Sequence, residues 1–144
     1  MMAYYSRILI AYDGSEMSKK ALKMAEALAV QDEKIEIRVV SVFTPPTTLG
    51  NFAIFTEELY DKLRESTQEV VKKASQALKK LPNHIQTNVL RGNAGHMIVG
   101  YAKEYDCDLI VMGSRGLSGL KEVLVGSTSH YVVQHAHCPV LVAK

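Results

Sequence analysis

Short β-prone runs alternate with amphipathic segments along the chain. Five segments have the length and composition of strands, and they span residues 6–12, 35–43, 84–90, 109–112 and 139–143. Four of them are largely apolar, as is typical of strands that are buried on both faces of a sheet. The segment 84–90 alternates apolar and polar residues less strictly, which favours a strand at the edge.

Four segments between these strands place apolar residues at helical spacing. They span about 15–30, 56–81, 92–105 and 127–135. Ser15 or Asp13 can cap the first helix, and Pro82 ends the second. Two prolines and a glycine make 44–51 the clearest loop. In the second helix the spacing predicts one buried stripe, made of Leu59, Leu63, Val70, Ala74, Ala77, Leu78 and Leu81.

Strands that alternate with helices predict a parallel sheet with helices on both of its faces. At 144 residues we expect one domain, residues 1–144, of the doubly wound, Rossmann-like α/β class. Such sheets bind ligands beyond the carboxyl ends of their strands, where the strand order reverses. Asp13 follows the first strand and Gly113 follows the fourth. If these strands are neighbours, the two residues face each other across one crevice.

Composition and charge narrow the classes of partner. The net charge of +2 argues neither for nor against a nucleic-acid partner. No basic cluster, however, is long enough to follow a nucleic-acid backbone. We expect Lys72-Lys73 and Lys79-Lys80 on a solvated helix face. No run reaches the roughly 18 apolar residues of a membrane span, and the first residues lack the features of a signal peptide. We therefore expect a cytoplasmic protein without nucleic-acid or membrane partners.

The segment from Gly113 to Ser129 carries the strongest chemical signal. Its skeleton is Gly113, two residues, Gly116, nine residues, and then Gly126-Ser127-Thr128-Ser129. Glycines allow the backbone to approach a ligand closely with its N–H groups directed inward. Small hydroxyl residues that open a helix add further donors and the positive end of the helix dipole. Two such clusters separated by a spacer predict a site that binds a polyphosphate, and a side chain at Gly126 would be expected to occupy phosphate space.

The same residues resemble the universal stress proteins. The resemblance extends over nearly the whole chain and includes the opening run Ile8–Ser15, the glycine segment, and the ending His135–Val142. The spacing of Gly113, Gly116 and Gly126-Ser127 is similar to the pattern of the ATP-binding subgroup. Members that do not bind ATP carry a degraded form of it.

The resemblance implies a fold, a ligand and an assembly. The sheet would have five parallel strands in the order 3-2-1-4-5, and a homodimer would form through the last strand, Pro139 to Ala143. The ligand would be ATP, or ADP or AMP, with Mg²⁺. Asp13 would contact the ribose or the metal, and the Val42 backbone would recognise adenine. The implied nucleotide contacts are Asp13, Val42, Met112, Gly113, Arg115, Gly116, Gly126, Ser127 and Thr128.

Plainer interpretations of these residues stay open. The glycines can be turn residues, Asp13 can be only a helix cap, and Arg115 can be a solvated side chain. His135-Ala136-His137-Cys138 contains zinc-type ligands, but a fourth ligand is missing and the end of a helix explains the run better. Cys107 and Cys138 are by default small buried apolar residues.

Three classes of function compete. The one that we favour is a regulatory module of the stress response that binds ATP and hydrolyses it slowly or not at all, with the 44–55 loop bordering the base. An ATPase or phosphotransferase would need a base beside the terminal phosphate, and none is evident. A dimeric interaction protein that does not use nucleotide would not need the intact glycine pattern. No Gly-Lys-Ser/Thr loop follows the first strand, which excludes a P-loop NTPase.

Overall fold

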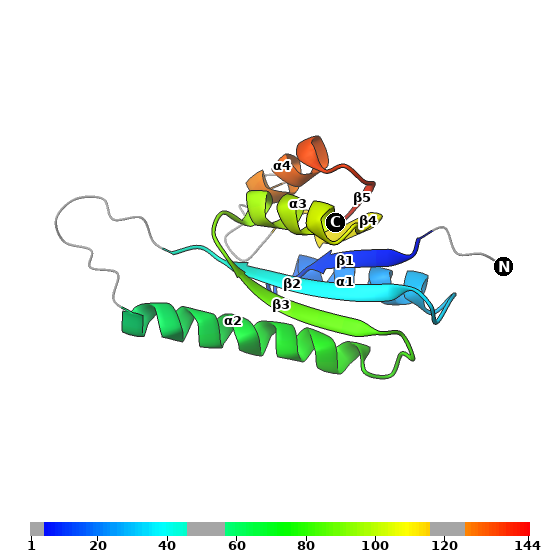
Figure 1. The fold of residues 1–144 in the computed structure, drawn as a ribbon, viewed down its shortest axis with the longest axis horizontal. Coiled ribbons are helices and arrows are strands. Elements are labelled where there is room, and N and C mark those ends of the chain that lie inside the picture. The colour runs from blue at the N-terminus through cyan, green and yellow to red at the C-terminus, as the bar shows by residue number, and fades with distance from the viewer. Residues whose placement is uncertain (1–4, 46–56, 116–125) are drawn as a thin grey trace.

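Strands and helices alternate throughout the computed structural model, which describes residues 5–45, 57–115 and 126–144 (Figure 1). The elements are β1 (Arg7–Ala11), α1 (Glu16–Ala29), β2 (Glu36–Phe43), α2 (Glu57–Leu78), β3 (Ile85–Arg91), α3 (Ala94–Glu104), β4 (Leu109–Gly113), α4 (Ser127–His135) and β5 (Val140–Ala143). Every predicted element is present, with bounds that differ by up to three residues. Most of the 44–55 loop lies outside the described residues.

All neighbouring strands in the sheet are parallel, and their order is β3-β2-β1-β4-β5. The expected order 3-2-1-4-5 is confirmed, as is the expectation that the 84–90 segment forms an edge strand. Strand β1 lies between β2 and β4, with Ala11 in register with both Val40 and Met112. The order of connection reverses between β1 and β4, so this pair of strands forms the switch point.

Helices cover both faces of the sheet, as Figure 1 shows. One apolar core lies under α1 and α2 and includes Ile8, Ile10, Val39 and Leu78. The other lies under α3 and contains Leu9, Val40, Ile98 and Ile110 as well as Val132 of α4. Successive residues of β1 enter opposite cores because side chains alternate along a strand. None of the helices in the described part of the chain has the length and hydropathy that a membrane span requires.

The predicted stripe on α2 is partly wrong. The residues of α2 that are buried are Thr67, Val71, Ala74 and Leu78. Leu59, which we expected on the stripe, is 39% exposed, and Ala77 is exposed as well. The buried spacing of four, three and four residues follows the helical period. Figure 1 shows that the first turns of α2 extend past the ends of the strands, so this part of the helix covers less of the sheet.

Asn83 joins two connections of the chain at the amino-terminal end of the sheet. Its buried Nδ2 donates to the carbonyl oxygens of Ala29 at 3.2 Å, Asp32 at 2.9 Å and Ile35 at 2.9 Å. These carbonyls belong to the connection between α1 and β2, and Asn83 belongs to the connection between α2 and β3. One amide group therefore ties the two connections together, and it adds to the backbone bonds that the Ala29 and Asp32 carbonyls already accept.

We expect Asn83→Asp to destabilise the protein strongly at neutral pH. The carboxylate has nearly the shape of the amide, but it would place an acceptor and a buried charge against three carbonyl oxygens. Asn83→Ala, which only removes the donors, should cost about 1–3 kcal/mol. Urea unfolding followed by circular dichroism measures both. If the aspartate variant were as stable as the parent, the carbonyls would not depend on this amide.

Candidate functional site

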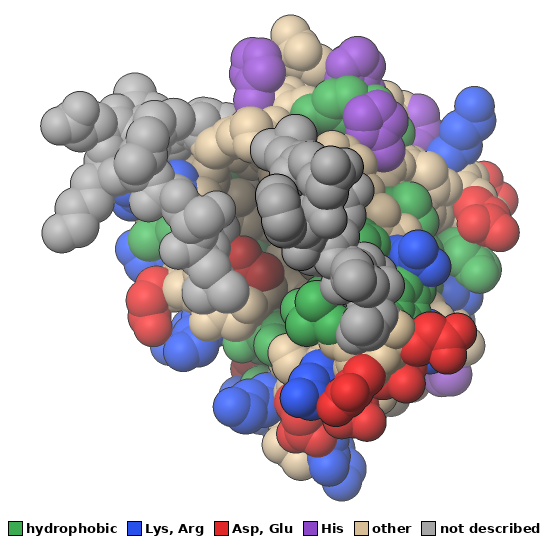
Figure 2. Space-filling view, turned by 90° about the vertical axis from the view of Figure 1, so that its left-hand side faces the viewer, with side chains coloured by type: hydrophobic (Ala, Val, Ile, Leu, Met, Phe, Trp, Pro, Cys, Tyr) green, Lys and Arg blue, Asp and Glu red, His purple; other side chains and the backbone are tan. Residues whose placement is uncertain are grey.

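Two turns of the chain meet at the switch point. Strand β1 continues into the Tyr12–Ser15 turn, and β4 continues into Ser114 and Arg115. Because β1 and β4 are neighbours in register, both turns leave the same edge of the sheet. Figure 2 shows the molecule from the side at which the strands end. Asp13 and Gly113, which the sequence predicted to face each other across a crevice, therefore lie at the ends of adjacent strands.

The turn after β1 is organised by short polar side chains. The Asp13 carboxylate accepts a hydrogen bond from the Ser15 N–H at 2.9 Å. Ser15 is the N-cap of α1, since its Oγ accepts from the Ser18 N–H at 3.2 Å. Gly14 has φ +84°, a conformation that L side chains rarely adopt. Of the two cap candidates Ser15 is the cap, and Asp13 closes the preceding turn.

Gly113 is required by packing. A Cβ on this residue would lie 2.7 Å from the Cβ of Met17 and 2.9 Å from the backbone nitrogen of Ser18. Both atoms belong to the first turn of α1, and such distances are too short for real contacts. The absence of a side chain therefore lets α1 approach the end of β4. This explanation adds to the phosphate interpretation of the glycine and is independent of it.

Ser114 joins β4, β5 and the start of α4. Its N–H donates to the Ala143 carbonyl at 2.7 Å. Its carbonyl accepts from the Gly126 N–H at 2.6 Å and from the Ser129 hydroxyl at 2.9 Å. Ser114 and Ser129 are each only 2% exposed. Ser114 belongs to none of the predicted donor sets, although its place directly after the buried strand could have suggested a role in the junction.

These bonds bring the two predicted donor clusters together. Gly126 is the N-cap of α4 and lies against Ser114 and Arg115. The first backbone bond within α4 runs from the His130 N–H to the Gly126 carbonyl at 2.9 Å. The N–H groups of the residues before His130 therefore have no acceptor within the helix. Ser127 is exposed and Thr128 is half-buried at this helix start. Gly116 lies outside the described residues.

Gly126 is a poor position at which to probe a ligand. A Cβ there would lie 3.2 Å from the Ser114 carbonyl oxygen and 3.9 Å from the Ser129 hydroxyl. The side chain would therefore press on the junction itself. That it would also occupy phosphate space stays a prediction. A large residue at this position would disturb the turn whether or not a ligand binds.

Val42 lies at the end of β2 with its backbone directed toward β1. The Tyr12 N–H donates to the Val40 carbonyl at 2.9 Å, so even-numbered residues of β2 point toward β1. The backbone hydrogen bonds between β1 and β2 end at Val40, because within these described strands no hydrogen bond joins Val42 to Tyr12. Val42 packs beside the core under α3, and so does Met112, which is 4% exposed. The Val42 backbone therefore faces the space beyond the end of β1.

Histidine and cysteine side chains take structural positions. His96 and His135 stack against Tyr131 with ring centroids 4.4 Å and 4.1 Å apart, and histidines gather over α3 and α4 at the top of Figure 2. Burial raises the pKa of the Cys107 thiol to about 11, which keeps it protonated. Within the ranges that the structure describes, no group of three His, Cys, Asp or Glu side chains is arranged to hold a metal ion.

These features define a doubly wound α/β protein whose two polar loops meet at the switch point of a parallel sheet. The universal stress protein family model matches residues 4–144, and the chain belongs to that family. It is 33% identical to universal stress protein YxiE of Bacillus subtilis, over 97% of this chain and 99% of the relative. It is 35% identical to universal stress protein MJ0531 of Methanocaldococcus jannaschii, over 97% of this chain and 82% of the relative.

Solved structures share the fold. MJ0577 of the same archaeon superposes with a TM-score of 0.83 at 28% identity, covering 97% of this chain and 96% of that one. A universal stress protein in complex with cAMP has a TM-score of 0.73 at 21% identity, with 99% of each chain covered. One from Archaeoglobus fulgidus in complex with dAMP has a TM-score of 0.68 at 22% identity, covering 99% of this chain and all of that one.

We expect Gly113→Ala to destabilise the protein and Gly100→Ala to stabilise it. The added methyl at 113 would collide with the first turn of α1, at a cost of about 1–3 kcal/mol. Gly100 lies exposed within α3, where a Cβ meets no atom within 4 Å, so alanine should add about 0.5–1 kcal/mol of stability there. Urea unfolding of the two variants beside the parent tests the contrast. Equal stability of both would refute the packing role of Gly113.

Proposed function

We propose that this protein binds ATP together with Mg²⁺ in the cleft between β1 and β4 and acts as a cytosolic, nucleotide-dependent regulator in the stress response. ADP or AMP would occupy the same cleft with fewer phosphate contacts. The observation that carries the proposal is the junction at Ser114, which holds Arg115 beside Gly126. Donor groups far apart in the sequence thereby lie at one end of the sheet.

The phosphates would lie against these donors. The opening residues of α4 combine N–H groups without intrahelical acceptors, two hydroxyl side chains and the positive end of the helix dipole. Arg115 would add a guanidinium that can bind two phosphate oxygens at once. Mg²⁺ prefers carboxylates and phosphate oxygens, and Asp13 supplies a half-buried carboxylate at the facing turn. Asp13 would therefore contact the ribose or the metal.

The base would lie near the end of β2. The Val42 backbone is directed into the space beyond β1, where an adenine could exchange hydrogen bonds with it. Guanine presents the opposite pattern of donors and acceptors at its six-membered ring, so we expect a preference for adenine. The cAMP and dAMP complexes of proteins with this fold indicate that the fold is compatible with an adenine nucleotide.

We expect hydrolysis to be slow or absent. Donors that bind the phosphates equally in the ground state and the transition state do not accelerate the reaction. Acceleration would need a group that orients and deprotonates a water molecule. The acid assigned to the cleft is Asp13, and its carboxylate already accepts from Ser15 in the turn after β1. ATP would therefore act as a bound signal.

Ser127→Glu should weaken ATP binding at least about tenfold, which corresponds to about 1.4 kcal/mol. The variant places a carboxylate where the phosphates are expected. A negative charge in the first turn favours the helix itself, so the loss would not reflect unfolding. Calorimetric titration with Mg-ATP measures the affinity, and titration with Mg-GTP under the same conditions tests the preference for adenine.

Gln134→Glu is the control for charge, because it adds the same negative charge at an exposed position near the other end of α4. Its affinity should stay within about twofold of the parent. Unchanged affinity of Ser127→Glu would remove the assignment of the site. Phosphate release under saturating Mg-ATP, if it were near the roughly 10 s⁻¹ typical of enzymes, would instead favour an ATPase.

We also propose a homodimer formed through β5. The Pro139 and Ala143 carbonyls accept bonds from β4 and its turn, so the backbone groups of Val140 and Val142 point away from the sheet. The three residues Val140 to Val142 are apolar and only half-buried. An apolar strand edge of this kind readily pairs with a second copy of itself.

Val142→Pro should convert the dimer into a monomer. Proline removes an outward N–H and leaves the bonds to β4 intact. Light scattering at micromolar concentration should give twice the chain mass of 15.9 kDa for the parent and that mass for the variant. A monomeric parent protein would contradict the proposal, and so would a dimeric Val142→Pro variant.

A further inference from the structure

A groove lies between α2 and β3, away from the cleft at the switch point. It has a volume of about 530 Å³ and is bordered by Arg64, Gln68 and Lys72 of α2 and by Thr87 and Val89 of β3. Phe43 and Val71 also line it, and Val71 and Val89 pack with the core under α1 and α2. Val42 packs on the other face of the sheet. Neither Val42 nor the turn after β1 contributes to the lining, so the groove is distinct from the proposed adenine position.

The lining of the groove is cationic. Arg64, Lys72 and Arg91 all contribute to it, and no aspartate or glutamate does. None of these three cations forms an ion pair with a carboxylate of the described residues, whereas Arg7, Lys19, Arg38, Lys62 and Lys80 do. Positive charges gathered along a groove without acidic partners favour an anionic ligand.

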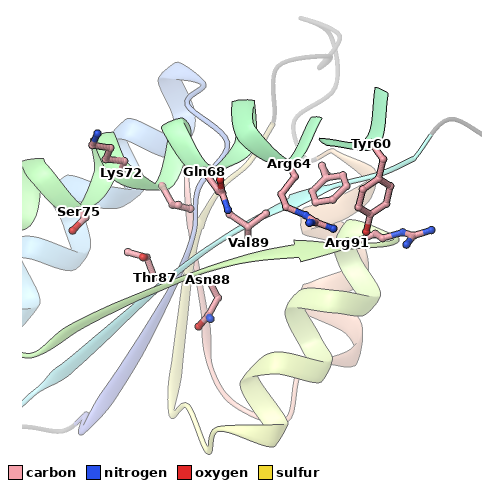
Figure 3. Close-up of a pocket in the computed structure, with 11 residues that line it drawn as sticks. Tyr60, Arg64, Gln68, Lys72, Ser75, Thr87, Asn88, Val89 and Arg91 are labelled. Carbon is pink, nitrogen blue, oxygen red and sulfur yellow. The ribbon is translucent and has the colours of Figure 1, made fainter. Parts of the chain in front are cut away.

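Two of the cations are held at one end by an aromatic ring. The guanidinium carbons of Arg64 and Arg91 lie 4.7 Å and 4.3 Å from the ring centroid of Tyr60. Hydrogen bonding by Arg64 lowers the pKa of the Tyr60 hydroxyl, and hydrogen bonding by Arg91 lowers it to a smaller extent. Figure 3 shows these three side chains together, with Lys72 and Ser75 toward the other end of the groove. Two like charges held near one ring form a ready contact for carboxylates.

The edge of β3 adds backbone groups to this groove. The His84 carbonyl and the Gly92 N–H bond to β2, so even-numbered residues of this strand face β2 and odd-numbered residues face outward. Thr87, Val89 and Arg91 are therefore directed outward, and all three line the groove. Among the described strands, β3 pairs only with β2. An open strand edge accepts an extended chain as an additional strand.

We propose that β3 and α2 form a docking groove for an extended acidic peptide segment of a partner protein, which adds to the sheet at the β3 edge and places its carboxylates against Arg64, Arg91 and Lys72. A segment of about six residues would span the strand at roughly 3.3 Å per residue. Alternate side chains of the segment would lie over the groove and place their carboxylates against these cations. The apolar floor at Val71 and Val89 would contact the aliphatic stems of the same side chains.

Other occupants fit less well. A second copy of this chain paired at β3 would bring two cationic grooves together, with like charges opposed. A small phosphate compound would use the guanidinium groups but would leave the strand edge unpaired. An acidic peptide satisfies the cations and the edge at once. The groove would then serve as the partner surface of the regulator, and this role does not require that nucleotide bind in the other cleft.

The test uses the whole protein and a fluorescein-labelled, capped octapeptide of alternating glutamate and valine. Fluorescence anisotropy measures its affinity, and a lysine–valine octapeptide should not bind. Replacing Arg64 and Arg91 by glutamine should raise the dissociation constant at least about tenfold. The control replaces Lys73 of α2 and Lys79 of the following turn by glutamine, which removes the same charge from exposed positions outside the groove. It should change the dissociation constant less than about twofold.

A second pair of variants tests strand pairing. Thr87→Pro removes an outward N–H without removing a bond to β2 and should weaken the peptide at least about tenfold, whereas Thr87→Val keeps the N–H and should bind it normally. Equal binding of the peptide to both Thr87 variants would overturn strand addition.

Equal binding of the peptide to the arginine variant and to its lysine control would overturn the assignment of the groove as the binding site. In a further measurement, inorganic phosphate is added at a concentration that supplies the same total negative charge as the peptide. If phosphate then displaced the peptide, the groove would be a site for small anions, and the proposal of a peptide ligand would be refuted. Saturating Mg-ATP should leave peptide binding unchanged.

Discussion

Helix α1 can reach the end of β4 because Gly113 has no side chain. The first turn of the helix, at Met17 and Ser18, occupies the space that a Cβ would need. This contact sets the separation between the Asp13 turn and the Ser114 loop, and Ser114 in turn holds Ala143 of β5 and the first turn of α4. The geometry of the cleft thus depends on a packing constraint between a helix and a strand end. A ligand would use an arrangement that the protein core already requires.

The two edges of the sheet differ in chemistry although they share one geometry. In both β3 and β5, alternate residues direct their backbone groups away from the sheet, since each strand has one neighbour among the described strands. At β5 these residues are apolar valines, which suit pairing with an identical edge. At β3 polar side chains and two arginines border the edge, which oppose pairing with a copy and favour an acidic chain. One fold would thereby separate assembly from partner recognition.

The proposed nucleotide cleft is built for binding more than for turnover. The donors assigned to it within the described residues lie at the start of α4 and at Arg115, beside the buried Ser114 and Ser129, so the protein itself holds their backbone in place. Such fixed donors stabilise a bound polyphosphate in all of its states. A regulator needs a difference between its bound and free forms that lasts, and slow hydrolysis preserves that difference.

Local patterns determined much of this protein in advance. The alternation of apolar runs with helical spacings determined the class of fold, because the periods of strand and helix are set by backbone geometry. The spacing of Gly113, Gly116 and Gly126 pointed to the cleft, and the family resemblance supplied the strand order. Only the tertiary structure decided that Gly113 is needed by α1, that Ser114 joins three elements, and that Leu59 is left exposed on α2. It also brought Tyr60, Arg64 and Arg91 together. These facts depend on contacts between residues that are distant in the chain. The hydrophobic period of a single segment does not determine which other segment it packs against.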